Sequence, residues 1–437
     1  MSRSQDSFQS NTSSSPKGDT DTTDKLYFRE RQVPFRLVVG FLALFSAFSI
    51  VIFISGTNYG MQMEKKKSPT THTIEPKIDS NNRQRVLVSS PEDFFPVAEF
   101  RRSSAILIGC HNQIRLMPQL FGNIAKAISG KVPIFGIVSD ESQARAGVEL
   151  IRNLGLPPDS MRFLVNPSDS IWIRDYAPFI LRYDEENTMM VDAKYRTRSS
   201  RQIRRKDEMM GIQFAKMLNL PVRSIPLLLE GGNMISNGDG LLLTSSKTLS
   251  LNKNGDNGYN DQQLVNIFSD YLGVNGVFAV AALDGEPNGH IDMFMTMLSK
   301  NLAVIAEISP SVDPVNSARL NETARFVSKI TTSSGPIVVK RIPMPPKWGD
   351  DWRSYTNVIF ANGTLLMPSF SDVDPAVEQK VMEIYQSSLP EGWEVKKVNC
   401  DQLVNLHGQL HCISYNLPGF LPIDALIKNS YPKKPLL

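Results

Sequence analysis

The sequence of 437 residues contains only three cysteines and five histidines. Cys110, Cys400 and Cys412 are too few and too widely spaced for a disulfide framework, so either one bridge with a remaining thiol or three free thiols fit their number. The formal charge is only +3, and basic residues alternate with acidic ones along most of the chain. We therefore expect no nucleic-acid partner. A hydrophobic content of 41% and a charged content of 21% are typical of a globular protein.

Long apolar runs are also scarce, with one exception near the N-terminus. Residues 1–33 have almost no aliphatic side chains, which predicts a disordered tail. The next segment, Leu37 to Ile54, has 18 residues without a charge, and as a helix it would cover about 27 Å, near the thickness of a bilayer. Its polar flanks disfavour a buried core helix, and its distance from the N-terminus disfavours a cleaved signal peptide. The sequence thus predicts a single transmembrane helix over residues 34–56, which would anchor the protein in a membrane.

The side of the membrane is less well indicated. Four basic residues precede the apolar run and three follow it, so the charge bias hardly discriminates between the two orientations. Asn321 and Asn362 lie in glycosylation sequons, which favours a lumenal, extracellular or periplasmic domain. Residues 57–84 are polar and are predicted to be a solvated linker.

From residue 85 onward, short apolar runs alternate with helical patterns. Strands are expected at 105–110, 132–138 and 161–166, and helices at 116–128, 141–154, 260–272 and 374–387. This rhythm predicts one α/β domain of similar modules over residues 85–425, followed by a C-terminal tail over 426–437.

Three polar motifs interrupt this pattern at the ends of apolar runs, at residues 170–179, 227–240 and 285–294. His290 and Asp292 are two residues apart, so on an extended segment an imidazole and a carboxylate would emerge on the same face. Such a pair is suited to proton transfer near a cationic substrate. A capped turn with a half-buried His290 is the alternative.

The other two motifs also contain candidate carboxylates. Arg174 and Asp175 would ordinarily face opposite sides of a strand, but Trp172 beside them offers a π face and Asp175 an acceptor for a guanidinium. Glu230 ends an apolar run, where a buried carboxylate needs a partner. A buried Glu230 would accept a hydrogen bond from His290 and orient it, and a surface salt bridge is the alternative.

Cys412, beside His411, has three interpretations: packing, metal binding or nucleophilic attack. Zinc needs about four ligands in a tetrahedron, and two adjacent residues cannot easily reach one ion, so we expect no metal. A buried structural thiol remains open, because free cysteine often packs as a small hydrophobe.

Taken together, five segments in this order resemble the Porphyromonas-type peptidyl-arginine deiminase and agmatine deiminase family. They are "WIRDYAPF", "LEGGNMISNGDGLLLTS", "NGHIDMFM", "RSYTNVIFANGTLLMP" and "GQLHCISYN". The resemblance extends from about residue 85 to residue 422. It implies an α/β pentein fold, a five-bladed pseudo-symmetric α/β propeller with its active site in the central channel.

The resemblance also implies a role for each matching residue. Cys412 takes the position of the nucleophile and His290 that of the general acid and base. Asp175 and Asp292 match the carboxylates that hold the guanidinium, and Glu230 matches the carboxylate that supports the histidine. The implied activity is hydrolytic deimination through a covalent thiouronium on the cysteine, without a metal or organic cofactor.

The implied substrate is an arginine derivative, small or peptidyl. Arg196 and Arg198 resemble the pair with which the peptidyl-arginine branch holds a substrate carboxylate, a bidentate task suited to arginine. A solvated basic strand end is the alternative. Asn357 matches a substrate contact, and Trp172 an aromatic residue of the substrate channel.

Two further functions remain open, namely agmatine deimination and an inactive module that binds arginine-bearing peptides. A structural membrane protein with a zinc site is a third interpretation. The sequence departs from the family at Ala177 and in the approach to Cys412, where only Gly408 remains of a glycine-rich stretch. The sequence does not indicate the oligomeric state.

Overall fold

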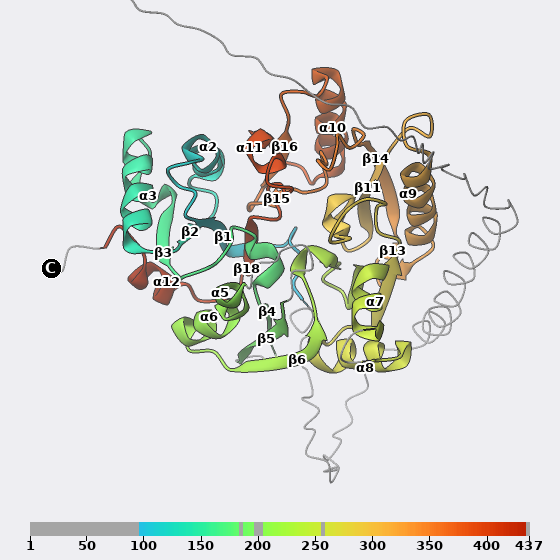
Figure 1. Cartoon of the computed structure of the whole chain (residues 1–437), viewed down its shortest axis with the longest axis horizontal. Helices are drawn as coiled ribbons and strands as arrows, with labels where there is room; N and C mark the ends of the chain where they lie inside the picture. Colours follow the sequence, from blue (N-terminus) through green and yellow to red (C-terminus); the bar gives the residue numbers. More distant parts are fainter. Residues whose placement is uncertain (1–95, 183–186, 196–203, 255–257, 434–437) are drawn as a thin grey trace, which may run out of the picture. The chain divides into compact units, whose positions relative to one another are not determined.

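The computed structural model describes residues 96–182, 187–195, 204–254 and 258–433. All of them lie within one unit of the chain, Ile52–Leu437. Within these residues, five sheets share one hydrogen-bonding pattern (Figure 1). In each sheet the first strand pairs antiparallel with the second, and the second pairs parallel with the third. We call the first strand of each sheet its inner strand.

In four of the sheets the strands follow one another in sequence order, interrupted in one of them by a small hairpin, and each has its inner strand first in sequence. They comprise β4 (Phe179–Arg182), β5 (Thr188–Lys194) and β6 (Val222–Leu228); β7 (Met234–Ser236), β8 (Leu241–Ser245) and β9 (Gly276–Val280); β10 (Met295–Ser299), β11 (Leu302–Glu307) and β14 (Val338–Pro343); and β15 (Ile359–Phe360), β16 (Thr364–Ser369) and β17 (Glu394–Asn399). A separate small hairpin pairs β12 (Thr331–Thr332) with β13 (Gly335–Pro336).

The fifth sheet joins the two ends of the described chain. Its inner strand β18 (Ser414–Pro418) pairs antiparallel with β1 (Ser103–His111), which continues in parallel to β2 (Ile134–Val138) and β3 (Arg162–Val165). This pairing places the residues around Cys412 beside the first strand of the domain.

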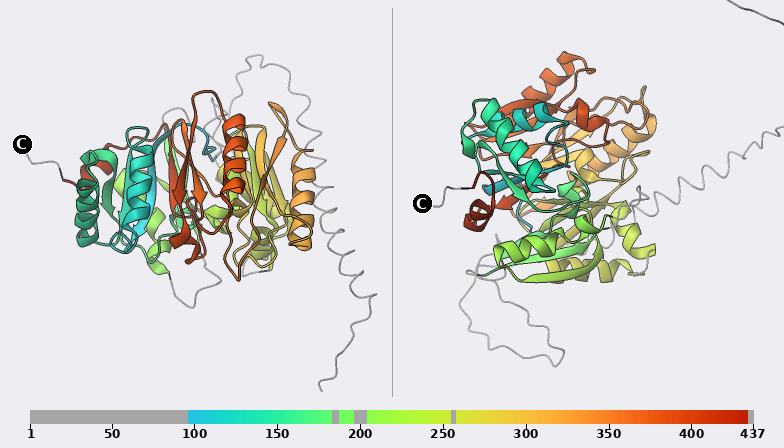
Figure 2. Two further views of the ribbon diagram at one scale, coloured as in Figure 1. Left: turned by 90° about the horizontal axis from the view of Figure 1, so that it is seen from above. Right: turned by 60° about the vertical axis from the view of Figure 1, so that its left-hand side comes forward.

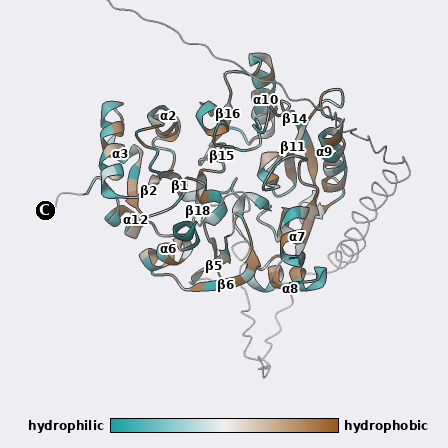
Figure 3. Ribbon diagram, viewed as in Figure 1, coloured by the Kyte–Doolittle hydropathy of each residue, from teal (hydrophilic) through white to brown (hydrophobic). Residues whose placement is uncertain are grey.

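Helices connect the parallel strands, because a parallel pair needs a crossover. Figures 1 and 2 show them on the outer side of the sheets. The connecting helices are α2 (Pro118–Ile128), α3 (Glu141–Asn153), α5 (Arg205–Glu208), α6 (Met210–Leu218), α7 (Ser246–Asn254), α8 (Asp261–Leu272), α9 (Pro314–Val327) and α10 (Pro375–Ser388). A 3-10 turn, η2 (Pro158–Ser160), precedes β3. Two short helices, α11 (Asp401–Val404) and α12 (Asp424–Asn429), lie near the C-terminus. Figure 3 shows hydrophilic and hydrophobic residues on the same helices, as expected for one face packed on a sheet.

Local sequence signals explain where these helices begin and end. Asp140 caps α3 by accepting a hydrogen bond from the Gln143 amide at 2.9 Å. Asn260 forms a capping box with Gln263 at the start of α8, and Gly273 ends that helix in the left-handed conformation. The helices expected at 141–154, 260–272 and 374–387 are therefore confirmed within a residue or two.

The three cysteines are buried and free. Cys110 and Cys400 lie in the same hydrophobic cluster with no solvent exposure, and burial raises the pKa of both thiols. The question of a bridge between them is thus answered in favour of three thiols.

The predicted fold class is wrong in its membrane part. No helix in the ranges that the structure describes combines the length and apolar character that a membrane span needs. The longest of these helices, α9 and α10, have 14 residues each and cover about 21 Å, less than the hydrocarbon thickness of about 30 Å. The segment 34–56 lies outside the described residues. We therefore withdraw the transmembrane helix and the single-pass membrane location with its lumenal, extracellular or periplasmic domain.

Candidate active site

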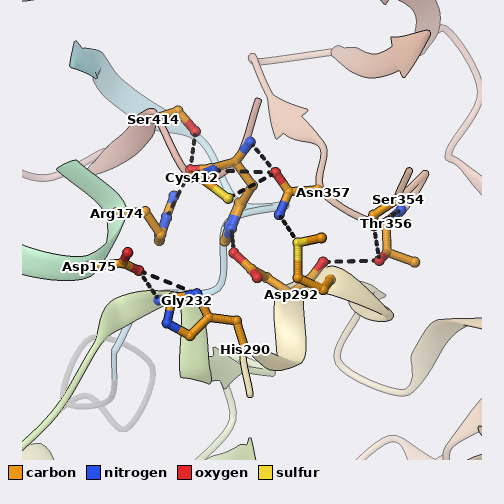
Figure 4. A network of polar contacts seen from close by, with 12 residues as sticks. Arg174, Asp175, Gly232, His290, Asp292, Ser354, Thr356, Asn357, Cys412 and Ser414 are labelled. Atoms are coloured by element: carbon orange, nitrogen blue, oxygen red, sulfur yellow. Dashed lines mark hydrogen bonds and ion pairs between the residues drawn. The ribbon is translucent and has the colours of Figure 1, made fainter. Parts of the chain in front are cut away.

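Figure 4 shows the predicted catalytic side chains Asp175, His290, Asp292 and Cys412 close to one another. Each comes from a short segment that directly precedes an inner strand. The one-turn helix α4 (Ile173–Tyr176) precedes β4, the 3-10 turn η3 (Gly231–Asn233) precedes β7, and the 3-10 turn η4 (Ile291–Met293) precedes β10. Cys412 precedes β18, and Asn357 precedes β15. The repeated module therefore brings five distant segments of the sequence together.

These segments are turns, which corrects two expectations. His290 and Asp292 do not share the face of an extended strand, because residues 291–293 form the turn η4. Arg174 and Asp175 likewise lie in the helix α4 and not in a strand. The side chains still meet, because each turn ends at the same level of its sheet.

His290 is held by carboxylates on both sides of its ring. Its Nε2 forms a 2.8 Å hydrogen bond with Glu230 Oε2, which is the predicted pair. Its Nδ1 lies 3.8 Å from Asp175 Oδ1, too far for a hydrogen bond. Burial lowers the pKa of His290, but the charges of Asp175 and Glu230 outweigh it and raise the pKa well above 6.5. His290 is therefore an imidazolium with one nitrogen turned toward the site.

The glycine pair after Glu230 allows the backbone to approach these groups. A Cβ on Gly231 would lie 2.0 Å from the carbonyl oxygen of Arg174. A Cβ on Gly232 would lie 2.8 Å from both Asp175 Oδ1 and His290 Nδ1, and 3.2 Å from Asp292 Oδ2. The Gly232 amide also donates to Asp175 Oδ1 at 3.2 Å. Three functional side chains thus surround one glycine, where any other residue would displace them.

A second histidine, His411, lies on the other side of the site. Its Nδ1 forms a 2.7 Å hydrogen bond with Asp292 Oδ2, and its Nε2 forms a 2.8 Å hydrogen bond with Glu99 Oε2. Burial lowers the pKa of His411 and so does Arg174, but the two carboxylates prevail and raise it. The second oxygen of Asp292, Oδ1, is buried and has no hydrogen-bond partner among the described residues.

Asn357 supports the segment that carries His411 and Cys412. Its Oδ1 accepts hydrogen bonds from the amides of His411 and Cys412, at 2.8 and 3.3 Å, and lies 3.5 Å from Cys412 Sγ. Its Nδ2 donates to the Met293 sulfur at 3.7 Å. In this structure Asn357, which is fully buried, contacts the turn that carries Cys412.

The charges around Cys412 favour its neutral form. Its side chain is 5% exposed, and burial, Asp292 and Asp175 together raise the pKa of the thiol well above 9. Burial also raises the pKa of Asp175, against the opposing charge of His290 and with the help of the neighbouring carboxylates. Both shifts indicate that the free site is short of positive charge, which a bound cation would supply.

Of the remaining predicted residues, the structure describes Trp172 but not Arg196 and Arg198. Trp172 lies half-buried against the approach to Cys412, where a Cβ on Gly408 would lie 2.3 Å from its ring. This contact explains why the single retained glycine is at 408. Arg196 and Arg198 lie outside the described residues.

Three residues of the site were not predicted from the sequence. Glu99 belongs to no motif, Arg174 was expected to face the opposite side of a strand from Asp175, and His411 was considered only as a metal ligand. The adjacency of His411 to Cys412 was the one available signal. In the part of the chain that the structure describes, no group of three or more His, Cys, Asp or Glu side chains is arranged to hold a metal ion.

Comparison with known proteins places these residues in context. The sequence model of the Porphyromonas-type peptidyl-arginine deiminase family matches residues 98–418. An agmatine deiminase from Stutzerimonas stutzeri is 24% identical over 335 residues, which cover 68% of this chain and 86% of that protein.

Two solved structures have a similar fold. The agmatine deiminase of Enterococcus faecalis has a TM-score of 0.63 at 19% identity and covers 76% of this chain and 99% of its own. A variant of C. jejuni agmatine deiminase with substrate bound has a TM-score of 0.61 at 16% identity and covers 74% of this chain and 96% of its own. This likeness fits the pentein part of the predicted fold.

Proposed function

We propose, because the chain belongs to the Porphyromonas-type peptidyl-arginine deiminase family, that it removes ammonia from a guanidino group through a covalent intermediate on Cys412. Family membership makes the chain a deiminase, a hydrolase that cleaves a C–N bond of a linear amidine. The chemistry of the individual side chains and the identity of the substrate are our own proposals.

The observation that carries the proposal is the pair of buried carboxylates beside the thiol. Asp292 is 2% exposed and keeps Oδ1 unpaired among the described residues, while Asp175 faces the same point from α4. A planar guanidinium between the two would receive charge-assisted hydrogen bonds on both edges and be held with its central carbon open to attack.

The substrate itself then activates the nucleophile. A guanidinium held by Asp175 and Asp292 compensates the negative charges that raise the pKa of Cys412, so the thiol releases its proton to solvent and the thiolate forms when the site is occupied. Its sulfur attacks the central carbon and forms a C–S bond. His290 gives its proton to the departing nitrogen, the C–N bond breaks, and ammonia leaves a thiouronium on Cys412.

The second half of the reaction uses the same groups in reverse. His290, now neutral, takes a proton from water, and the oxygen attacks the thiouronium carbon. The C–S bond breaks with its electron pair on the Cys412 sulfur, which takes up the remaining hydroxyl proton, and the ureido product leaves with the oxygen of that water. Glu230 holds the His290 ring in place through both transfers by its bond to Nε2, which leaves Nδ1 for the reaction.

For the substrate we propose an arginine derivative with a free carboxylate, held by Arg196 and Arg198, with Trp172 beside the substrate channel. Agmatine is the second candidate, because relatives with that name match most of the chain. Its cationic tail would be repelled by the two arginines.

The test is an assay of the ureido product from three compounds: a peptide ending in arginine, the same peptide amidated, and agmatine. Product from the free-carboxylate peptide alone supports both the chemistry and the two arginines, and Cys412→Ala should give none. Product from agmatine alone overturns the peptide assignment and keeps the mechanism. No product from any of the three, with the protein folded, overturns the proposed activity for these substrates.

A further inference from the structure

Glu99 lies in the segment that precedes β1, residues 96–102, and this segment runs near the centre of the five sheets (Figure 1). Pro96, Val97 and Glu99 line a cavity there together with residues of all five inner strands. The cavity also touches Arg174, Asp292 and His411. The N-terminal segment of the domain therefore reaches the catalytic groups from the far side of the nucleophile.

The Glu99 side chain, 23% exposed, is held by two cations. Its Oε1 forms an ion pair with Arg174 Nη1, and its Oε2 accepts the 2.8 Å hydrogen bond from His411 Nε2. Burial raises the pKa of Glu99, but the charges and hydrogen bonds of Arg174 and His411 outweigh this and lower it to about 2. Glu99 is therefore a carboxylate around neutral pH.

This contact determines the state of His411. Because carboxylates accept at both of its nitrogens, His411 donates at both and must be an imidazolium. It has no free nitrogen for proton transfer. His411 fixes Asp292 Oδ2 at 2.7 Å, and Asp292 Oδ1 stays buried without a hydrogen-bond partner among the described residues, which leaves this oxygen for the guanidinium.

Arg174 completes the arrangement. Its Nε donates to the carbonyl oxygen of His411 at 3.4 Å, and its backbone amide donates to the carbonyl oxygen of Cys412 at 3.2 Å. One carboxylate, Glu99, is thus connected to the nucleophile segment through Arg174 and to Asp292 through His411.

We propose that Glu99 is a positioning residue of the deimination reaction, which holds His411 as a cation and through it orients Asp292 toward the substrate guanidinium. The proposal rests on the proposed function for its substrate class. The proposal means that the reaction needs the negative charge of Glu99 and not only its volume, although His411 and Asp292 lie between Glu99 and the substrate.

The experiment compares Glu99→Gln with Glu99→Asp in the full-length protein, and with Glu378→Gln as the matched control. Glu378 is also a buried glutamate, but it accepts hydrogen bonds from the Phe370 amide, Lys397 and, at 3.5 Å, the Tyr355 hydroxyl, and none of these groups contacts Glu99, His411 or Asp292. Gln keeps the shape of Glu99 without its charge, whereas Asp keeps the charge. The readouts are kcat and KM for the best of the three substrates across pH 5 to 10, with the unfolding midpoint as a measure of folding.

We expect Glu99→Gln to lower kcat/KM about 10- to 100-fold near neutral pH, with a rise in KM because Asp292 is no longer fixed. Without Glu99 the pKa of His411 falls, so the cation is lost at a lower pH and the alkaline limb of the profile moves to lower pH. Glu99→Asp should restore the position of that limb. Glu378→Gln should leave KM and the pH profile unchanged.

A purely structural role for Glu99 would lower the active fraction and so kcat, without moving KM or the alkaline limb, and that result overturns the proposal. If Glu99→Gln does not fold, Glu99→Asp decides: wild-type KM and pH profile support the need for charge, and a shifted limb despite the retained charge overturns it.

A second measurement needs no substrate and separates this proposal from the proposed function. The rate at which iodoacetamide modifies Cys412, followed by mass spectrometry, reports the thiolate across pH. Loss of the His411 cation next to Cys412 should shift the Glu99→Gln profile to higher pH than that of the wild type. Coinciding profiles overturn the positioning role even if no substrate is turned over.

Discussion

Two buried histidines lie on either side of Cys412, and each is flanked by two carboxylates. His290 has Glu230 at 2.8 Å and Asp175 at 3.8 Å, whereas His411 has Asp292 at 2.7 Å and Glu99 at 2.8 Å. His290 has a nitrogen that is not hydrogen-bonded by its neighbouring carboxylate, whereas both nitrogens of His411 are engaged. In the proposed mechanism, this difference of about one ångström at one contact makes His290 a proton donor and His411 a support.

The largest effect is expected when the sulfur atom of Cys412 is removed. Cys412→Ala should lower turnover by at least about 10⁴-fold, because no other group can form the C–S bond. The assay is ureido product against time at saturating substrate. Cys400→Ala is the control: this thiol is buried in the core, and activity per folded molecule should be retained. Equal losses in both variants would mean that Cys412 acts only through packing.

Next in size is the comparison of the histidines themselves. His290→Gln should lower kcat by about 10³-fold or more, because acid and base catalysis are both lost. His411→Gln should lower kcat/KM about 10- to 100-fold, mainly through KM. Steady-state kinetics of the two variants at one pH measures this contrast. If His411→Gln lost as much kcat as His290→Gln, the division of roles would be wrong.

A smaller loss, about tenfold in kcat/KM, is expected for Gly232→Ala. The added Cβ would lie 2.8 Å from both Asp175 Oδ1 and His290 Nδ1, so these flexible ends must move apart while the fold persists. Kinetics and the unfolding midpoint should be measured together. A large drop in the midpoint with unchanged kinetics of the folded fraction would contradict a role for this glycine in the site.

The last effect concerns the stability of the fold at acidic pH and leaves turnover at neutral pH unchanged. The pKa of Glu99 is lowered from 4.5 to about 2 in the folded protein, so its charge stabilises the fold above pH 4.5 and this contribution is lost as pH falls toward 2. The shift corresponds to at most about 3 kcal/mol. The free energy of unfolding of wild type should therefore approach that of Glu99→Gln as pH falls through this range. Urea titrations at pH 2 to 6 measure it, and a constant difference would contradict the lowered pKa.

Much of the fold was predictable, because strand and helix periods repeat from module to module. The helices near 141–154, 260–272 and 374–387 have clear caps and amphipathic spacing, and they occur where expected. The local shape of the motifs was not predictable in the same way. A spacing of two residues suggested an extended segment for His290 and Asp292, but the same spacing also fits the 3-10 turn that the structure has.

The residues of the site were likewise predictable only where a local pattern indicated their partners. Glu230 and His290 were paired correctly, because a carboxylate at the end of an apolar run needs a donor. Glu99 was not found, because it lies 312 residues from His411 in the sequence, and no local pattern predicts a contact over that distance. It required the pairing of β1 with β18, which brings the beginning of the domain to its end. The transmembrane prediction rested on the length and composition of a single apolar run, and no helix among the described residues has the character of a membrane span.

The most direct test of the central claim is to mix the full-length protein with the substrate it turns over, quench with acid within milliseconds to seconds, and measure the mass of the Cys412 peptide. A covalent intermediate predicts a mass increase equal to the mass of the substrate less ammonia. The adduct should be more abundant in His290→Gln if hydrolysis is slowed more than attack, and it should be absent in Cys412→Ala. Turnover without any such adduct at Cys412, at every quench time and in both proteins, would contradict the account.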